Sequence, residues 1–315
     1  MKVLFILDSI HDLKFPWDTS SFLAAECQRR GWGLFLCEPR HLFWHENQPW
    51  GECHAAQINP KKGIRLKSRA KRFSLNEFQF VWMRQDPPVD HHYIQTCQLL
   101  ARVSPPTIVL NNPAALIEKN EKLFALEFPQ WSPRTCVSRL GSELHAFLKK
   151  EGKAVIKPLN QRGGIGVELV SWPHFGPQKR WHELTENENT YILAQQYLPA
   201  AMTQGNKRIL LVDGKPIGAF VRPPTPDTLS GKPSPYVSDL ATTLTAKEKK
   251  LCAELSPVLK KLGLFFVGID VIAEKLIEIN VTSPAGIPEM NKLYGGAFEK
   301  KIVDLLCRKF LQGKR

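Results

Sequence analysis

The sequence has no long hydrophobic run and no paired cysteines, and these absences exclude several classes of protein. The first apolar run, Val3 to Leu7, stops after five residues at Asp8, which is too short for the core of a secretory signal peptide. No stretch approaches the apolar length of a membrane span. The seven cysteines form no CxxC pair and have no histidines at zinc-ligand spacing. We therefore expect a cytoplasmic protein with reduced thiols and no membrane partner.

The glycine-rich stretch from Gln161 to Gly166 lacks the features of two common nucleotide-binding motifs. No Lys-Ser or Lys-Thr pair follows its glycines, as in a Walker A motif, and no helical pattern follows, as in a dinucleotide fingerprint. Strand patterns at 153–157 and 167–170 flank it instead. Such a loop can surround a phosphate with backbone amides, and Lys157 adds a positive charge beside it. An ordinary glycine-containing β-turn is the alternative for this stretch alone.

Acidic residues are scarce relative to basic ones. The chain has 43 Lys and Arg against 30 Asp and Glu, a net charge of +13, which favours an anionic partner or simply solubility. The densest basic run, residues 61–72, contains no acidic and no aromatic residue. Because stacking on nucleic acid bases requires aromatic side chains, we interpret this run as a solvated surface loop. A nucleic acid is not the partner we expect, and remains a minor alternative.

The N-terminal part of the chain has the pattern of a parallel sheet. Strand patterns at 3–7 and 33–37 surround a helical pattern at 22–30, which Ser or Thr can cap and Gly31 ends. This β-α-β order favours an α/β fold. Residues 38–76 have no regular pattern, and we interpret them as irregular.

Further strand patterns carry polar residues at their ends. The strand pattern 78–83 runs into Arg84 and Asp86, where open α/β sheets place ligand contacts, although a salt bridge holding a Pro-Pro turn explains them nearly as well. Asn112 and Pro113 open a helix, which we expect to carry Lys122. A change in composition near 129–133 predicts a linker to a second unit.

The C-terminal half contains the clearest hairpin signal. Asp213-Gly214 suits a type I′ turn between strands at 207–212 and 215–221, with cations at the open end of the hairpin. The Pro-, Ser- and Thr-rich segment that follows, to Tyr236, predicts a mobile loop. Thr245 and Glu248 form a capping box for a helix that Gly263 ends, and a last amphipathic helix starts near Ala297.

A second hairpin pattern, residues 264–281, brings carboxylates together. If Ala273 to Lys275 form a three-residue loop, Ile272 pairs with Leu276 and Asp270 lies opposite Glu278, with Asn280 on the same face. Facing carboxylates repel each other, so they require a cation or a solvated edge. Two carboxylates and an amide oxygen suit Mg²⁺. Three unrelated polar residues on a solvated face are the alternative.

Four separate pieces of sequence thus form one consistent set for binding a polyphosphate and its metal. They are Lys122, then Lys157 with Gly163 and Gly164, then Arg208 and Arg222, and finally Asp270, Glu278 and Asn280. Cations and backbone amides would hold the phosphates, and the oxygen ligands would hold the metal. Chance agreement of four pieces is less plausible than any single alternative above.

The sequence resembles the ATP-grasp superfamily and, within it, the prokaryotic-type glutathione synthetases. The matching blocks, in order, are Met83 to Pro88, Asn120 to Phe124, Ile156 to Leu159, Ala194 to Pro199, Lys207-Arg208, Val267 to Asp270 and Glu278 to Pro284. The resemblance implies a mixed α/β (α+β) fold. A preATP-grasp domain with a parallel sheet (1–121) would precede an ATP-grasp domain (122–315), whose antiparallel sheets clasp the nucleotide between a lid at about 130–200 and a catalytic part at about 201–315.

The resemblance also implies roles for individual residues. Nucleotide contacts would come from Lys122, Lys157, Gly163, Gly164, Gln196, Tyr197, Leu198 and Lys207. Arg208 and Arg222 would be catalytic and steady the transferred phosphoryl group, while Asp270, Glu278 and Asn280 would hold the metal. Substrate contacts would come from Arg84, Asp86, Asn280 and Ser283. The implied cofactors are ATP and Mg²⁺, with a second ion or Mn²⁺ as variants; the implied partners are small-molecule substrates, and a homo-oligomer is left open.

The family's reaction joins a carboxylate to an amine through an acyl phosphate, with γ-glutamylcysteine and glycine as substrates. Residues 223–236 depart from the family pattern, because they lack its Arg-Gly-Asn core, and Asn160 to Arg162 alter the glycine loop. A related ligase with another acid or amine is therefore an alternative. A non-catalytic nucleotide or nucleic-acid binder is a second alternative, motivated by the basic run 61–72.

Overall fold

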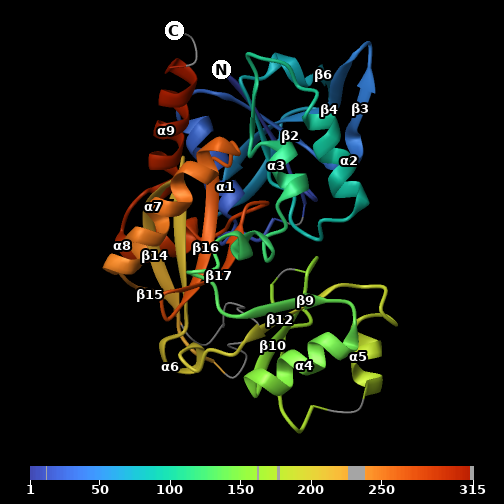
Figure 1. The fold of residues 1–315 in the computed structure, drawn as a ribbon. Coiled ribbons are helices and arrows are strands. Elements are labelled where there is room, and N and C mark those ends of the chain that lie inside the picture. Colours follow the sequence, from blue (N-terminus) through green and yellow to red (C-terminus); the bar gives the residue numbers. More distant parts are fainter. Residues whose placement is uncertain (12, 162, 176–177, 226–237, 313–315) are drawn as a thin grey trace.

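The computed structural model describes residues 1–11, 13–161, 163–175, 178–225 and 238–312, which form three β-sheets with helices packed against them (Figure 1). Most of the segment 223–236, expected to be mobile, lies outside these residues. Among the described helices, none is both long and apolar enough to cross a membrane.

The first sheet is built from the N-terminal third of the chain. Its strands are β1 (Lys2–Ile6), β2 (Gly33–Cys37), β3 (Leu42–His45), β4 (Gln48–Asn59), β5 (Gly63–Leu66), β6 (Lys71–Ser74), β7 (Phe80–Met83) and β8 (Ile108–Leu110). They follow the order β3-β4-β2-β1-β7-β8, with β5 and β6 paired to β4. Strands β2, β1, β7 and β8 run parallel to one another. The expected parallel sheet is confirmed.

Three α-helices and three short 3₁₀-helices belong to this part of the described chain: α1 (Thr19–Arg29), α2 (His91–Leu100), α3 (Pro113–Glu118), η1 (Pro39–His41), η2 (Leu75–Glu77) and η3 (Phe124–Glu127). Helix α1 connects β1 to β2, as predicted, but begins at Thr19 rather than at residue 22. The cap is Asp18, whose Oδ1 accepts a hydrogen bond of 2.6 Å from Ser21 N. Because Thr19 to Ser21 are buried, tertiary contacts outweigh their weak helix propensity.

Residues 38–76 contain the four strands β3 to β6, so the interpretation of this region as irregular was wrong. The long strand β4 pairs antiparallel with β2, β3, β5 and β6. Its Gly51, Ala55 and Ala56 have low β-propensity, and pairing along both edges holds them in a strand. The basic run 61–72 lies partly in β5 and β6 and partly in the turn before β5 and the loop between the two strands, so the expectation of a surface loop holds only in part; its Lys and Arg side chains are exposed as expected.

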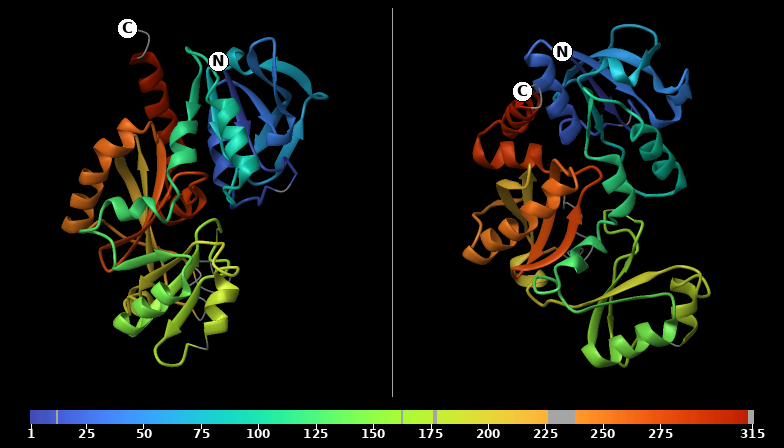
Figure 2. Two further views of the ribbon diagram at one scale, coloured as in Figure 1. Left: turned by 45° about the vertical axis from the view of Figure 1, so that its right-hand side comes forward. Right: turned by 45° about the horizontal axis from the view of Figure 1, so that its top comes forward.

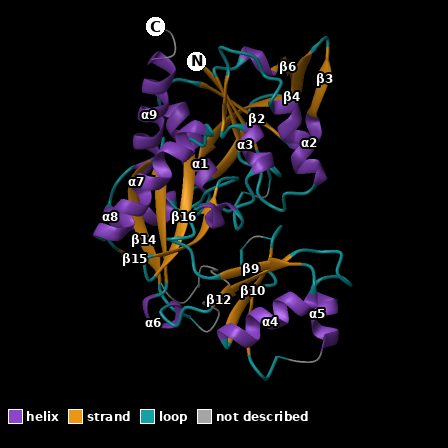
Figure 3. Ribbon diagram, viewed as in Figure 1, coloured by secondary structure: helices purple, strands orange, loops and turns teal. Residues whose placement is uncertain are grey.

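The second sheet is antiparallel and has its own small core. Its strands are β9 (Thr135–Ser138), β10 (Lys153–Pro158), β11 (Glu168–Ser171) and β12 (Ile192–Gln196), in the order β11-β10-β12-β9. Helices α4 (Gly141–Glu151) and α5 (Gln178–Leu184) lie together on one side of it (Figure 3). Leu144, Leu148, Ile156 and Trp181 are buried between the helices and the strands. A short helix, α6 (Ala201–Gln204), leads to the third sheet.

The third sheet is also antiparallel, in the order β15-β14-β13-β16-β17. Its strands are β13 (Asn206–Val212), β14 (Lys215–Arg222), β15 (Leu240–Ala241), β16 (Phe266–Ile272) and β17 (Lys275–Asn280), and its helices are α7 (Ala246–Lys261), α8 (Ile287–Tyr294) and α9 (Phe298–Gln312). Positive φ at Asp213 (48°) and Gly214 (72°) confirms the first predicted turn. The capping box of α7 is confirmed, since Thr245 and Glu248 each bond the other's backbone amide.

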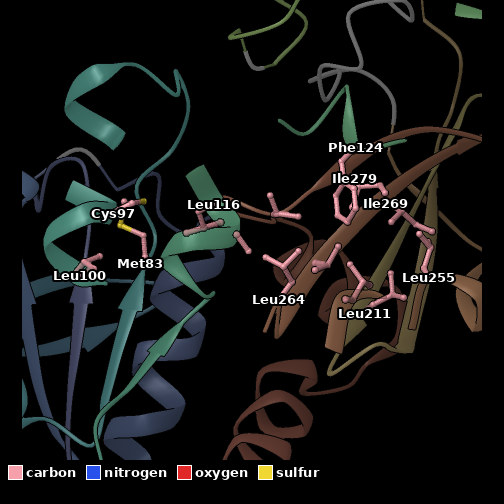
Figure 4. Packing of buried hydrophobic residues seen from close by; sticks show 14 of the residues in the cluster. Met83, Cys97, Leu100, Leu116, Phe124, Leu211, Leu255, Leu264, Ile269 and Ile279 are labelled. Carbon is pink, nitrogen blue, oxygen red and sulfur yellow. The ribbon is translucent and has the colours of Figure 1, made fainter. Parts of the chain in front are cut away.

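The first and third sheets share two apolar clusters, whereas the second sheet has a cluster of its own and stands apart from them (Figure 2). Figure 4 shows Met83 and Leu116 of the first part in the same cluster as Leu211, Leu255 and Ile269 of the third. The lid-like second sheet is therefore the part of the described chain with the least apolar anchoring to the rest.

Asn111 joins the first sheet to the third through its side-chain amide. Its Nδ2 donates hydrogen bonds of 2.7 Å to Phe266 O and 2.7 Å to Val281 O, and its Oδ1 accepts one of 2.9 Å from Phe266 N. The residue is 3% exposed. The amide thus supplies hydrogen-bond partners to buried backbone groups of β16 and of Val281, the residue after β17.

Replacing Asn111 by Leu should lower the free energy of unfolding by about 3 kcal/mol, because buried backbone donors and acceptors would lose their partners. Urea unfolding followed by tryptophan fluorescence would measure the change. Gln98→Ala, on the exposed side of α2, serves as the control and should change stability by less than about 0.5 kcal/mol. An Asn111 variant as stable as the control would contradict this role.

Candidate active site

A cavity of about 1130 Å³ is lined by residues from all three sheet regions. Most of the residues predicted as site residues line it, namely Asp86, Lys122, Lys157, Gly163, Gly164, Gln196, Tyr197, Leu198, Arg208, Arg222, Asp270, Glu278, Asn280 and Ser283. Arg84 and Lys207 do not. The fold thus brings together side chains that are up to about 200 residues apart in sequence, from Asp86 to Ser283.

The hairpin of β16 and β17 supplies the carboxylates. Its turn contains two residues, Ala273 and Glu274, with φ of 48° and 62°, so the expected three-residue loop was wrong and Ile272 pairs with Lys275. The register then shifts by one residue between Asp270 and Val271. This irregularity restores the predicted pairing of Asp270 with Glu278, which is confirmed.

Asp270 forms a buried ion pair with Arg208, which lies directly opposite on β13. Arg208 Nε donates to Asp270 Oδ1 at 2.5 Å and Nη2 donates to Oδ2 at 2.9 Å, while Asn280 Nδ2 donates to Oδ2 at 3.3 Å. Burial raises the pKa of Asp270, but the Arg208 guanidinium outweighs it and holds this pKa below its usual range. Asp270 is therefore ionised at neutral pH and held in one orientation.

Lys122 connects the third sheet to the glycine loop. Its Nζ lies 3.4 Å from Glu278 Oε1 and donates a hydrogen bond of 2.7 Å to Gln161 O. The expectation that a helix carries Lys122 was wrong, because α3 ends at Glu118. Asn120 Oδ1 instead holds the turn by accepting from Lys122 N at 3.1 Å.

Lys157 lies on β10, across the cavity from the carboxylates. Its Nζ donates to Gln195 Oε1 at 2.8 Å, a contact that sequence reasoning missed, because it assigned roles only to Gln196, Tyr197 and Leu198 of the block Ala194 to Pro199. Burial lowers the pKa of Lys157 to about 8; Glu278 acts in the opposite direction and Lys122 in the same direction. Next to it, Gly163 and Gly164 have φ of 59° and 71°, a conformation that favours glycine and exposes backbone amides.

Glu121 is a second residue that sequence reasoning missed. Its Oε1 accepts hydrogen bonds from Val281 N (2.8 Å), Thr282 N (3.0 Å) and Thr282 Oγ1 (2.8 Å). Burial, followed by the nearby Glu278 carboxylate, raises the pKa of Glu121. These bonds fix the end of β17, and with it the positions of Glu278 and Asn280.

The two predicted residues outside the cavity have other partners. Arg84 is 4% exposed; its Nε donates to Ser20 Oγ and its Nη2 to Pro284 O, both at 2.9 Å. Burial lowers the pKa of Arg84 to about 10, which leaves it charged at neutral pH. Lys207 pairs with Glu248 at 2.8 Å. Arg84 thus positions the residues after β17, and Lys207 secures β13 to α7.

Oxygen ligands for a metal are present on one face of the hairpin. Within the described residues, no group of three or more His, Cys, Asp or Glu side chains is arranged to hold a metal. Asp270, Glu278 and the amide of Asn280 form a smaller oxygen-only set, which fits Mg²⁺ better than a softer ion. Arg208 and Lys122 balance the two carboxylates, so the set has limited excess negative charge.

Proteins of known family are similar to this chain in sequence and in fold. The N-terminal domain of prokaryotic glutathione synthetase matches residues 1–116, and the ATP-grasp domain of the same family matches residues 121–295. The glutathione synthetase of Parasynechococcus marenigrum is 40% identical over 93% of this chain and 94% of its own length. That of Gloeobacter violaceus is 37% identical over 97% and 96%.

Solved structures with the same fold are more distant in sequence. A D-cycloserine synthetase superimposes with a TM-score of 0.69 at 13% identity, covering 98% of this chain and 99% of that one. A macrocyclase from Microcystis aeruginosa bound to a precursor peptide gives 0.64 at 16% identity, covering 98% and 100%. These similarities confirm the expected ATP-grasp fold. The chain belongs to the prokaryotic glutathione synthetase family and is an ATP-dependent carbon–nitrogen ligase.

Proposed function

We propose that this protein joins γ-glutamylcysteine to glycine, using ATP and Mg²⁺. The observation that carries the proposal is the alignment of Arg208, Asp270 and Glu278 across three neighbouring strands, facing Lys157 and the glycine loop in one cavity. The names of the relatives from Parasynechococcus marenigrum and Gloeobacter violaceus support glutathione synthesis. We assign residues 1–121 to an N-terminal domain and 122–315 to the ATP-grasp domain, with a lid at about 130–200.

In the first step of the proposed reaction, the acid substrate's carboxylate attacks the γ-phosphorus of ATP and ADP leaves. Lys157, Lys122 and the amides of the glycine loop would neutralise the phosphates, and Arg208 with Arg222 would steady the transferred group. Asp270, Glu278 and Asn280 would hold Mg²⁺, which would offset the negative charge of the phosphates when bound. Positioning and charge neutralisation therefore carry most of the catalysis.

In the second step, the amine attacks the acyl carbon and phosphate leaves. Val155, Ile272, Ile277, Tyr197 and Leu198 also line the cavity. We assign the adenine base to these apolar side chains and the part beside Arg222 to the substrates. Asp86 and Ser283 would contact the acid substrate there.

The experiment that tests the proposed function is ADP release by the full chain with γ-glutamylcysteine and glycine in the presence of Mg²⁺. We expect turnover that requires both substrates and stops when EDTA removes the metal. Each of the common amino acids, offered in place of glycine, tests the alternative of another acceptor. No turnover with the first pair, together with turnover with a different amine, would overturn the proposed substrates.

Glu278→Gln should lower kcat by about 100-fold or more, because the neutral amide can hold neither the metal nor Lys122 as the carboxylate does. Steady-state ADP release would measure this loss. The matched control is Glu274→Gln in the turn of the same hairpin, whose carboxylate pairs with Lys247 outside the cavity. Equal losses in both variants would indicate damage to the hairpin rather than to the site.

ATP binding should weaken as the pH rises from 7 to 9. Lys157 has a pKa of about 8, so it is mostly charged at pH 7 and mostly neutral at pH 9, when it no longer attracts phosphate. Calorimetric titration with ATP at several pH values would measure the effect. Lys157→Arg keeps its charge throughout this range and should remove most of the pH dependence. An unchanged pH dependence in that variant would assign it to another group.

A further inference from the structure

One part of the cavity has charged residues to which no step above assigns a role. Asp239 lies just before β15, Glu289 lies in the first turn of α8, and Lys292 lies one turn further along α8. All three line the cavity together with Arg222, at the end of β14. The electrostatic neighbours of Asp239 and Glu289 are Arg208, Arg222 and Lys292, and not Lys122 or Lys157. This group is therefore on the Arg222 side of the cavity.

The two carboxylates are partly withdrawn from water. Glu289 Oε2 is buried and has no hydrogen-bond partner within the described residues. Neither Asp239 nor Glu289 forms an ion pair with another described residue. Burial raises the pKa of both carboxyl groups, and the charge of Asp239 adds to the effect on Glu289. Arg222 lies near both carboxylates and offsets part of the cost of burying two like charges, but Glu289 Oε2 still lacks a hydrogen-bond donor among the described residues.

A further oxygen atom points to a hydrogen-bond donor in the same region. Asn206, the first residue of β13, lines the cavity, and its buried Oδ1 has no partner among the described residues. Acceptors without partners are uncommon in folded proteins, because each costs about 1–3 kcal/mol. A ligand group that carries both a positive charge and several N–H donors would satisfy Asn206, Asp239 and Glu289 together. An ammonium group has these properties.

We propose that Glu289 and Asp239 form the subsite for the ammonium group of the amine substrate. Arg222 lies within electrostatic reach of both carboxylates and Lys292 within reach of Asp239, so the region complements a zwitterion rather than a simple amine. The substrate class is thus a small amino acid. This inference rests on the proposed ligase function and identifies where its second substrate binds.

A structural role for Glu289 can be separated from this one. Glu289 is the third residue of α8, where a negative charge also stabilises the helix N-terminus. Glu143 occupies the same third position of α4, and it is exposed and outside the cavity. Glu143→Gln therefore reproduces the loss of charge at a helix start without touching the subsite, and it is the matched control.

The test compares Glu289→Gln, Asp239→Asn and Glu143→Gln in the full chain. With γ-glutamylcysteine and ATP, we expect the first two variants to raise the KM for glycine at least 10-fold and to change the KM for ATP less than twofold. Glu143→Gln should change neither constant. An equal rise in the KM for glycine in Glu143→Gln would overturn the subsite.

A second readout uses hydroxylamine in place of glycine. Hydroxylamine is uncharged at neutral pH and traps the acyl phosphate as a hydroxamate, so it does not require an ammonium subsite. Glu289→Gln and Asp239→Asn should form hydroxamate at close to the wild-type rate while their use of glycine falls. Parallel loss of both products would overturn the subsite and indicate a damaged fold or first step. Absence of both products from the wild-type protein would instead contradict the proposed function.

Discussion

The buried ion pair between Arg208 and Asp270 is the interaction on which the rest of the site depends. It links β13 to β16 at directly opposite positions, and both side chains are less than a tenth exposed. Removing either partner would leave a buried charge at a cost of about 3–5 kcal/mol. Gly268 accommodates the pair, because a Cβ there would lie 3.3 Å from Arg208 Cδ. The ion pair thus orients Asp270 toward Glu278 and Asn280.

The same charges that would serve the reaction also hold parts of the chain together. Lys122 contacts Glu278 on the third sheet and the carbonyl oxygen of Gln161 in the glycine loop of the second. Among the described residues, the apolar clusters of these two sheets are separate. Polar contacts around the cavity therefore contribute much of the interaction between the two sheets. Glu121 adds to this arrangement by fixing the residues after β17.

Much of the site could be predicted from local sequence, and the hairpin of β16 and β17 shows both the success and its limit. Alternating apolar residues predicted the strands and the pairing of Asp270 with Glu278. The turn between β16 and β17 was predicted to contain three residues but contains two. A shift of register in β17 restores the predicted pairing of Asp270 with Glu278. Lys122 was placed correctly by its motif but not on the correct element. Gln195 and the residues 38–76 were missed, because partners distant in sequence hold them.

The sequence by itself determined the β-α-β opening, the turn at Asp213-Gly214, the cap of α7 and the family, because these follow from residue types at short spacing. Only the tertiary structure decided which charged side chains contact one another. Arg208 pairs with Asp270, which lies 62 residues further along the chain. Arg84 donates hydrogen bonds to Ser20 and Pro284 and does not line the cavity. It also brought Asn206, Asp239 and Glu289 to the wall of the same cavity. Such contacts depend on sheet register and burial, which separate segments establish only when they pack together.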